Sequence, residues 1–175
     1  MIFSVSRHSM LFTDRQHLDS GPKTNREWTP IRDAVRFKGS KYGKLDKPLL
    51  VAVNFGSLHL ARLDEMQALY GQEQFMFSVD EPDKEPRLER APNGVWRGRT
   101  GPQATRVSGA WLFNDLTPYT VASRRHTIYF NPWAASPLPE VLKILPHAIA
   151  QGGRMQWHPS AQLRDILELP EGWPE

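Results

Sequence analysis

The chain has 175 residues, a size that fits one domain, and its hydrophobic share of 39% and charged share of 23% are ordinary for a globular protein. It contains no cysteine, which excludes disulfides, thiolate catalysis and cysteine-ligated zinc or iron–sulfur clusters. No apolar stretch is long enough to span a bilayer and the N-terminal sequence has no signal-peptide pattern, so we expect a cytoplasmic protein with no membrane partner.

The net charge of +3 is distributed unevenly along the chain. Residues 1–45 hold nine Lys or Arg against four Asp or Glu, residues 64–90 hold eight acidic against three basic side chains, and residues 97–125 hold five Arg and one Asp. This pattern fits a nucleic-acid footprint if both basic stretches fold onto one face, or ordinary solvated loops of mixed sign.

The first elements follow from hydrophobic spacing. We expect a strand at residues 2–5 within an otherwise loosely structured N-terminal segment, residues 1–28. Apolar residues at helical spacing predict a helix over residues 30–42, which Gly43 ends. The run LLVAVN at 49–54 is almost wholly apolar, so we expect a strand that is covered on both faces inside a mixed or parallel sheet.

The middle of the chain alternates between apolar and charged stretches. An apolar stripe predicts a helix over residues 60–70, and FMFSV at 75–79 predicts a strand that would complete a βαβ-like passage. Residues 80–106 are rich in charge, Pro and Gly, and we interpret them as an exposed loop region that is first acidic and then basic.

The last third contains two further apolar runs and two helical patterns. VSGAWLFNDL at 107–116 and TIYFN at 127–131 predict buried strands joined by a hairpin-like link. Residues 139–150 predict a helix that Pro146 ends or kinks, and the tail predicts one more short helix, capped by Ser160. These elements together predict one α/β (or α+β) domain over residues 1–175.

The order of elements around SKYGKLDKPLLVAVNFG resembles the later half of a PD-(D/E)XK restriction endonuclease-like domain. A helix ending in Lys38, Lys41 and Gly43 is followed by a Pro-containing turn, the strand LLVAVN and an acidic helix ending in ALYG, over residues 29–71. The resemblance implies a mixed sheet with helices packed on it, and basic residues that lie near nucleic acid.

The chain departs from that family at the catalytic motif. The family holds its metals with an Asp and a Glu, and a Lys two residues after the Glu positions the attacking water. Neither Glu-x-Lys nor Asp-x-Lys occurs in this chain. We therefore identify no catalytic or metal-ligating residue and no cofactor, and expect a metal-dependent nuclease only if residues outside the chain complete the site.

Several residues are candidates for binding. If the resemblance holds, nonspecific phosphate contacts to DNA or RNA are expected from Lys38, Lys41, Arg106, Arg124 and Arg125. The alternative is a protein-interaction module or accessory subunit, an oligomer included, whose mark would be an exposed apolar patch of Trp and Phe.

Two other features are interpreted as structural. The six histidines show no spacing that encodes a metal site on one element, so we interpret them as ordinary surface or core residues. In the turn NPWAASPLP we expect Asn131 to bond the backbone and Trp133 to bury its ring as a packing anchor.

Overall fold

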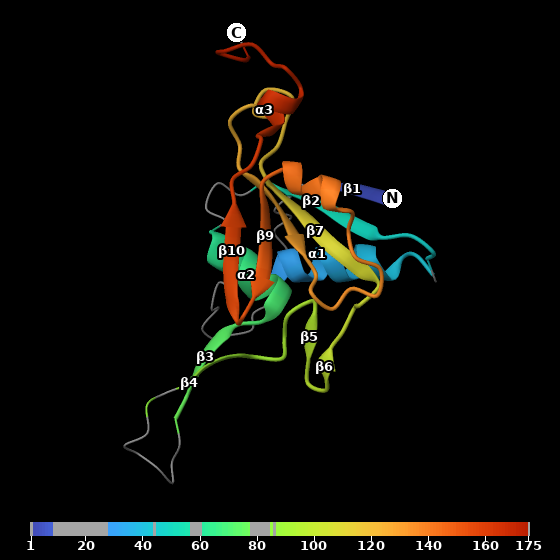
Figure 1. The fold of residues 1–175 in the computed structure, drawn as a ribbon, viewed down its shortest axis with the longest axis vertical. Helices are drawn as coiled ribbons and strands as arrows, with labels where there is room; N and C mark the ends of the chain where they lie inside the picture. The colour runs from blue at the N-terminus through green and yellow to red at the C-terminus, as the bar shows by residue number, and fades with distance from the viewer. Residues whose placement is uncertain are drawn as a thin grey trace, which may run out of the picture.

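A six-stranded mixed sheet forms the centre of the computed structural model (Figure 1). The structure describes residues 2–8, 28–43, 45–56, 61–77, 85 and 87–174. In spatial order the strands are β1 (Ile2–His8), β2 (Leu49–Phe55), β7 (Val107–Asn114), β8 (His126–Phe130), β9 (His147–Gln151) and β10 (Arg154–His158). Strands β1, β2 and β7 are mutually parallel, β8 is antiparallel to β7 and parallel to β9, and β10 is antiparallel to β9. The expected mixed sheet of an α/β or α+β fold is confirmed.

Strand β2 lies in the interior of this sheet because it is apolar on both faces. Every residue of β2 except Asn54 is buried, as its sequence predicted, and the strand is flanked by β1 and β7. Val51 packs with the two long helices, whereas Leu50 points to the opposite face, where it packs with Ile128 and Leu138. Both faces of β2 are therefore dry.

The two long helices cover one face of the sheet. The predicted helices correspond to α1 (Trp28–Ser40) and α2 (Arg62–Tyr70). Ile31 and Val35 of α1 and Leu69 of α2 are buried in the same cluster as alternate residues of β2. In the described part of the chain, no helix is long and apolar enough to cross a membrane.

The N-terminal segment is more ordered than expected. Residues 2–8 pair with β2 along their whole length, so the prediction of a loose segment over 1–28 is wrong for these residues. These residues form a strand because β2 needs a partner on this side. Pairing with β1 satisfies backbone groups of β2 that would otherwise be buried without hydrogen bonds. The prediction is also wrong for Trp28, the buried first residue of α1, and residues 1 and 9–27 lie outside the described residues.

The strand predicted at 75–79 does not join the central sheet. Strand β3 (Glu73–Met76) pairs antiparallel with β4 (Arg87–Arg90), and the two form a separate hairpin that projects away from the sheet (Figure 1). All four residues of β3 are exposed, so the predicted βαβ passage is wrong. The residues of β3 favour an extended conformation, but pairing with β4 places the strand outside the central sheet.

The expected exposed region at 80–106 contains buried residues. Ala91, Val95 and Trp96 are buried. The backbone N–H groups of Val95 and Trp96 donate to the carbonyl oxygens of Ala68 and Leu69 at the end of α2, at 2.8 and 2.9 Å. These bonds draw the segment into the core, so the prediction of exposure is wrong here. A second small hairpin follows, made of β5 (Arg97–Gly98) and β6 (Gly101–Pro102).

The predicted helix at 139–150 is a short 3-10 helix, η1 (Glu140–Ile144), followed by strand β9. Pro146 ends the helical stretch, as expected, and Gly152 and Gly153 then turn the chain from β9 into β10 with φ of 58° and 75°. The tail helix is α3 (Leu163–Ile166).

Ser160 does not cap the tail helix, because the residue at its N-cap position is Gln162. The Ser160 hydroxyl instead donates to the carbonyl oxygen of Lys143, at 3.1 Å, and so ties the tail to the segment of η1.

Candidate functional site

Three of the five predicted phosphate-binding residues lie where α1 ends and β7 begins. Lys38 is buried, with 8% of its surface exposed, which leaves little of it for a contact with phosphate. The Lys41 ammonium lies 4.6 Å from the centre of the Phe37 ring. Arg106 donates to the carbonyl oxygen of Tyr42, at 3.1 Å.

The other two predicted residues lie at the opposite end of β7, just before β8. Arg124 lies 3.7 Å from the carboxylate of Asp115, and Arg125 forms an ion pair of 2.6 Å with Glu65. The five residues are therefore split between the two ends of the sheet. The structure does not bring them together into one footprint.

Glu65 is the centre of a buried polar cluster beside Arg125. The Glu65 side chain is 3% exposed, and its carboxylate accepts hydrogen bonds from Arg125 and from the Tyr129 hydroxyl, at 3.0 and 2.5 Å. Burial, together with the adjacent Glu65 carboxylate, raises the pKa of Tyr129 well above its usual value, so its hydroxyl keeps its proton. Part of the Arg125 charge is consequently neutralised inside the protein.

A cavity of about 310 Å³ lies beside this cluster, where β8 and β9 begin and β10 ends. We call it the histidine pocket; it is lined by Arg62, Arg125, His126, His147, Trp157 and His158, among others. The described residues that line it include no Asp and no Glu. The guanidinium carbon of Arg62 lies 5.5 Å from the centre of the Trp157 ring, within the range of a cation–π contact.

The three histidines of this pocket are held by specific contacts. The rings of His147 and His158 stack, with centroids 4.6 Å apart and planes inclined by 14°. His126 accepts a hydrogen bond from the Trp111 indole N–H at 3.2 Å, so its other nitrogen carries the proton. Burial lowers the pKa of His126 to about 4, so its ring is neutral at neutral pH.

These histidines come from three strand ends that are far apart in sequence, which is why sequence spacing missed them. In the part of the chain that the structure describes, no group of three or more His, Asp or Glu is arranged to hold a metal ion.

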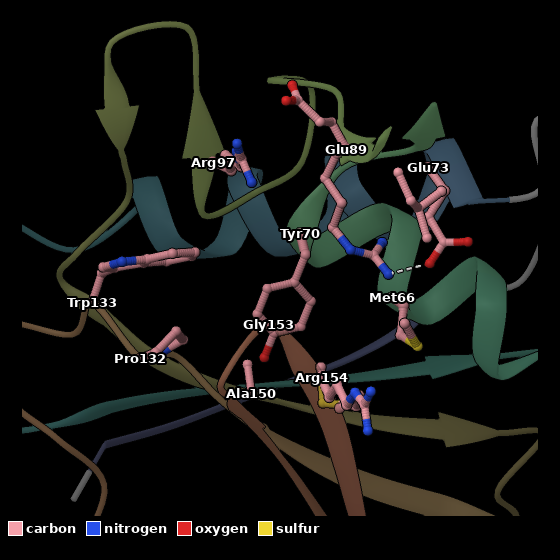
Figure 2. Close-up of a pocket in the computed structure, with 13 residues that line it drawn as sticks. Met66, Tyr70, Glu73, Glu89, Arg97, Pro132, Trp133, Ala150, Gly153 and Arg154 are labelled. Carbon is pink, nitrogen blue, oxygen red and sulfur yellow. Dashed lines mark hydrogen bonds and ion pairs between the residues drawn. The ribbon is translucent and has the colours of Figure 1, made fainter. Parts of the chain in front are cut away.

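A larger cavity, of about 500 Å³, lies at the other end of α2 (Figure 2). We call it the arginine–tryptophan pocket. Its apolar lining comes from Met66 and Tyr70 of α2, from Ala150 and Met155 of the β9–β10 hairpin, and from Trp133. In Figure 2 the Tyr70 ring lies in the centre, between Trp133 on the left and the β9–β10 turn below.

Three arginines surround this second pocket. Arg90 is committed to the protein, because it forms an ion pair with Glu73 and donates to the carbonyl oxygen of Gly71 at 2.9 Å. Arg97 and Arg154 are exposed and form no ion pair with any residue that the structure describes. Two arginines of this pocket are therefore free of ion pairs within the described residues, and the carboxylates of Glu73 and Glu89 line the same pocket.

Trp133 is held in place by its turn rather than by burial. Asn131 accepts a hydrogen bond from the Trp133 backbone N–H at 3.0 Å and donates to the carbonyl oxygen of Val107 at 2.8 Å, as the turn sequence predicted. The prediction that Trp133 buries its ring is wrong, because 37% of the residue is exposed. The ring lines the pocket, and its centre lies 6.5 Å from that of the Tyr70 ring.

The two pockets lie at opposite ends of the same pair of elements. Arg62, at the start of α2, lines the histidine pocket, and Tyr70, at the end of α2, lines the arginine–tryptophan pocket. Strand β10 runs the other way, from Arg154 at the arginine–tryptophan pocket to His158 at the histidine pocket. We call this line between the pockets the α2–β10 seam. At a rise of 1.5 Å per residue, α2 spans about 12 Å between them.

No protein-family model, curated protein or solved structure matches this chain. The relationship to restriction endonuclease-like proteins therefore stays a prediction, as does the cytoplasmic location.

Proposed function

We propose that the chain is a restriction endonuclease-like domain or fragment that binds nucleic acid and has no self-contained active site. The observation that carries nucleic-acid binding is the histidine pocket, which is lined by Arg62 and Arg125 and by no described Asp or Glu, although Arg125 pairs with Glu65 beside the pocket. Phosphate oxygens are the ligands that such guanidinium groups prefer, because charge-assisted bonds to them are short and strong.

Arg62 is the principal phosphate contact in this proposal. Arg125 already shares its charge with Glu65, whereas Arg62 is exposed at the first turn of α2 and its guanidinium makes a cation–π contact with Trp157. The planar fork of N–H donors of a guanidinium is suited to bidentate phosphate binding.

The family part of the proposal is supported by the connection between β1 and β2. Helix α1 lies in the sequence between two adjacent parallel strands of the sheet, and Lys41 follows its last turn. This is the arrangement that the resemblance implied, a helix connecting core strands with a basic residue at its end.

The test is fluorescence anisotropy with labelled single-stranded and duplex DNA, at about 50 mM and about 200 mM salt. We expect binding that falls steeply with salt, and a salt slope that is smaller by about one for Arg62→Ala. Arg99→Ala removes the same charge from an exposed residue that lines neither pocket, and serves as the matched control. Absence of binding at low salt, or equal affinities for Arg62→Ala and Arg99→Ala, would refute the proposal.

The second candidate function, a protein-interaction module, is favoured by the β3–β4 hairpin. Phe75 and Phe77 expose 66% and 71% of their surface, and Leu88, directly opposite Phe75, exposes 57%. The occupant that the pure protein can test is a second copy of the chain. Sedimentation velocity should then show a dimer that Phe75→Ser converts to a monomer, and a wild-type monomer would reject self-association through this hairpin.

A further inference from the structure

We propose that the nucleic acid is single-stranded and lies along the α2–β10 seam, with a phosphate in the histidine pocket and a base stacked against Trp133 in the arginine–tryptophan pocket. This inference rests on the proposed function and assigns to each pocket the part of the ligand that it fits.

Trp133 has the properties of a base-stacking platform. Its ring is partly exposed at the wall of a cavity. The Asn131 side chain holds the turn that carries this ring, because its amide oxygen accepts from the Trp133 backbone N–H and its amide nitrogen donates to the carbonyl oxygen of Val107. A fixed aromatic ring loses little conformational entropy on binding, and base stacking on it tolerates every base because each has a π-face.

The remaining walls of the cavity carry charged groups of both signs. Arg97 and Arg154 add two cationic groups and Glu73 and Glu89 add two carboxylates, whereas the Tyr70 ring lies in the centre (Figure 2). Burial raises the pKa of Tyr70 well above its usual value, so its ring stays neutral under the base. The cavity volume of about 500 Å³ lies within the usual range for small-ligand sites.

The position of Trp133 favours a single strand. About 12 Å along α2 corresponds to roughly three or four nucleotides at the stacked rise of about 3.4 Å per nucleotide, which a duplex and a stacked single strand share. A duplex keeps its bases paired in the interior of the helix, so it reaches Trp133 only at the cost of flipping a base out of the stack. A single strand presents the base without that cost.

The experiment compares four labelled probes of about 12 nucleotides, within the usual site size of single-strand binders: a single-stranded DNA, the matching duplex, single-stranded RNA, and a DNA strand whose sugars carry no bases. Each is titrated against the wild type, Trp133→Ala, Trp133→Phe and Arg62→Ala, with Arg99→Ala as the control. Quenching of tryptophan fluorescence is recorded in parallel, because a base on Trp133 quenches the wild type and not Trp133→Phe.

We expect the single strand to bind more tightly than the duplex and the baseless strand. Trp133→Ala should weaken single-strand binding by about five- to a hundredfold, and Trp133→Phe should restore most of it. Arg62→Ala should weaken all four probes alike, because it acts on the phosphate.

Two failures are distinguishable. If Arg62→Ala weakens binding but Trp133→Ala does not, or if the duplex and the baseless strand bind as tightly as the single strand, the inference is wrong and the proposed function stands. If no probe binds at low salt, both are wrong.

Discussion

Replacing Glu65 by Ala should destabilise the protein more than any other single loss of a carboxylate among the described ion pairs. The Glu65 side chain is 3% exposed, and it pairs with Arg125 and accepts from the Tyr129 hydroxyl. Removing one partner of a buried ion pair costs about 3–5 kcal/mol, because the remaining charge is left without compensation. The Arg125 side chain is 29% exposed, so water relieves part of that cost, and we expect about 3 kcal/mol.

The loss is measurable by urea denaturation followed by tryptophan fluorescence. For a chain of this size, about 3 kcal/mol corresponds to a fall in Tm of roughly 6–12 °C. Glu140→Ala is the control, because the Glu140 side chain is 80% exposed and pairs only with Lys143 on the surface. It should change the free energy of unfolding by less than about 0.5 kcal/mol.

A double-mutant cycle separates the pair from the rest of the cluster. Arg125→Ala alone leaves the Glu65 carboxylate buried beside Tyr129, so it should cost a similar amount. Because the two residues interact directly, the double variant should lose at least about 1 kcal/mol less than the sum of the single variants. Additive losses would show that Glu65 and Arg125 do not stabilise each other, and a loss below about 1 kcal/mol for Glu65→Ala would refute the reasoning from burial.

Three further predictions concern the core. Val51→Asp places a carboxylate in a fully buried strand position and should cost several kcal/mol, so the variant should be unfolded by circular dichroism; a melting temperature equal to that of the parent would contradict the fold. Burial lowers the pKa of His126 from 6.5 to about 4, so the unfolded chain binds the proton first. The stability due to the neutral ring is therefore complete above about pH 6.5 and lost as the pH falls towards 4, by about 2 kcal/mol at pH 5, and His126→Gln should reduce that loss in urea titrations. Gly94→Ala should destabilise strongly, since a Cβ there would lie 2.4–2.7 Å from backbone atoms at the end of α2, whereas Gly43→Ala, with nothing within 4 Å, should leave the unfolding midpoint nearly unchanged.

The sequence determined those parts of the fold where one local pattern is sufficient. LLVAVN has no polar face, so an interior strand is the arrangement that hides both of its faces. The helices over 30–42 and 60–70 each show a single apolar stripe, and α1 and α2 bury those stripes on the same face of the sheet.

Other parts depended on partners that a local pattern does not contain. FMFSV is apolar enough for a core strand, yet β3 pairs with β4 and stays exposed. Strand β9 was not predicted, because the residues just before Pro146 show helical spacing. The pair Gly152 and Gly153 nevertheless marks the turn of a hairpin.

The candidate site was the least predictable part. Arg62, His126 and His158 are far apart in the sequence and meet only because β8 and β10 bring their ends to the start of α2. Trp133 was expected to be buried because its turn is stiff, but the same stiffness holds a partly exposed ring at a cavity.

The position of β2 between β1 and β7 has a consequence for synthesis on the ribosome. Once residues 2–55 have left the exit tunnel, β2 has its parallel partner β1 on one side, but its other edge waits for β7, which begins at Val107. Residues 56–106, which include the β3–β4 hairpin, must be synthesised in between, and this takes several seconds at roughly 5–20 residues per second. Throughout that interval the nascent chain presents an apolar strand with an open edge. During this interval, chaperone binding or pairing with a neighbouring nascent chain competes directly with the pairing of β2 and β7.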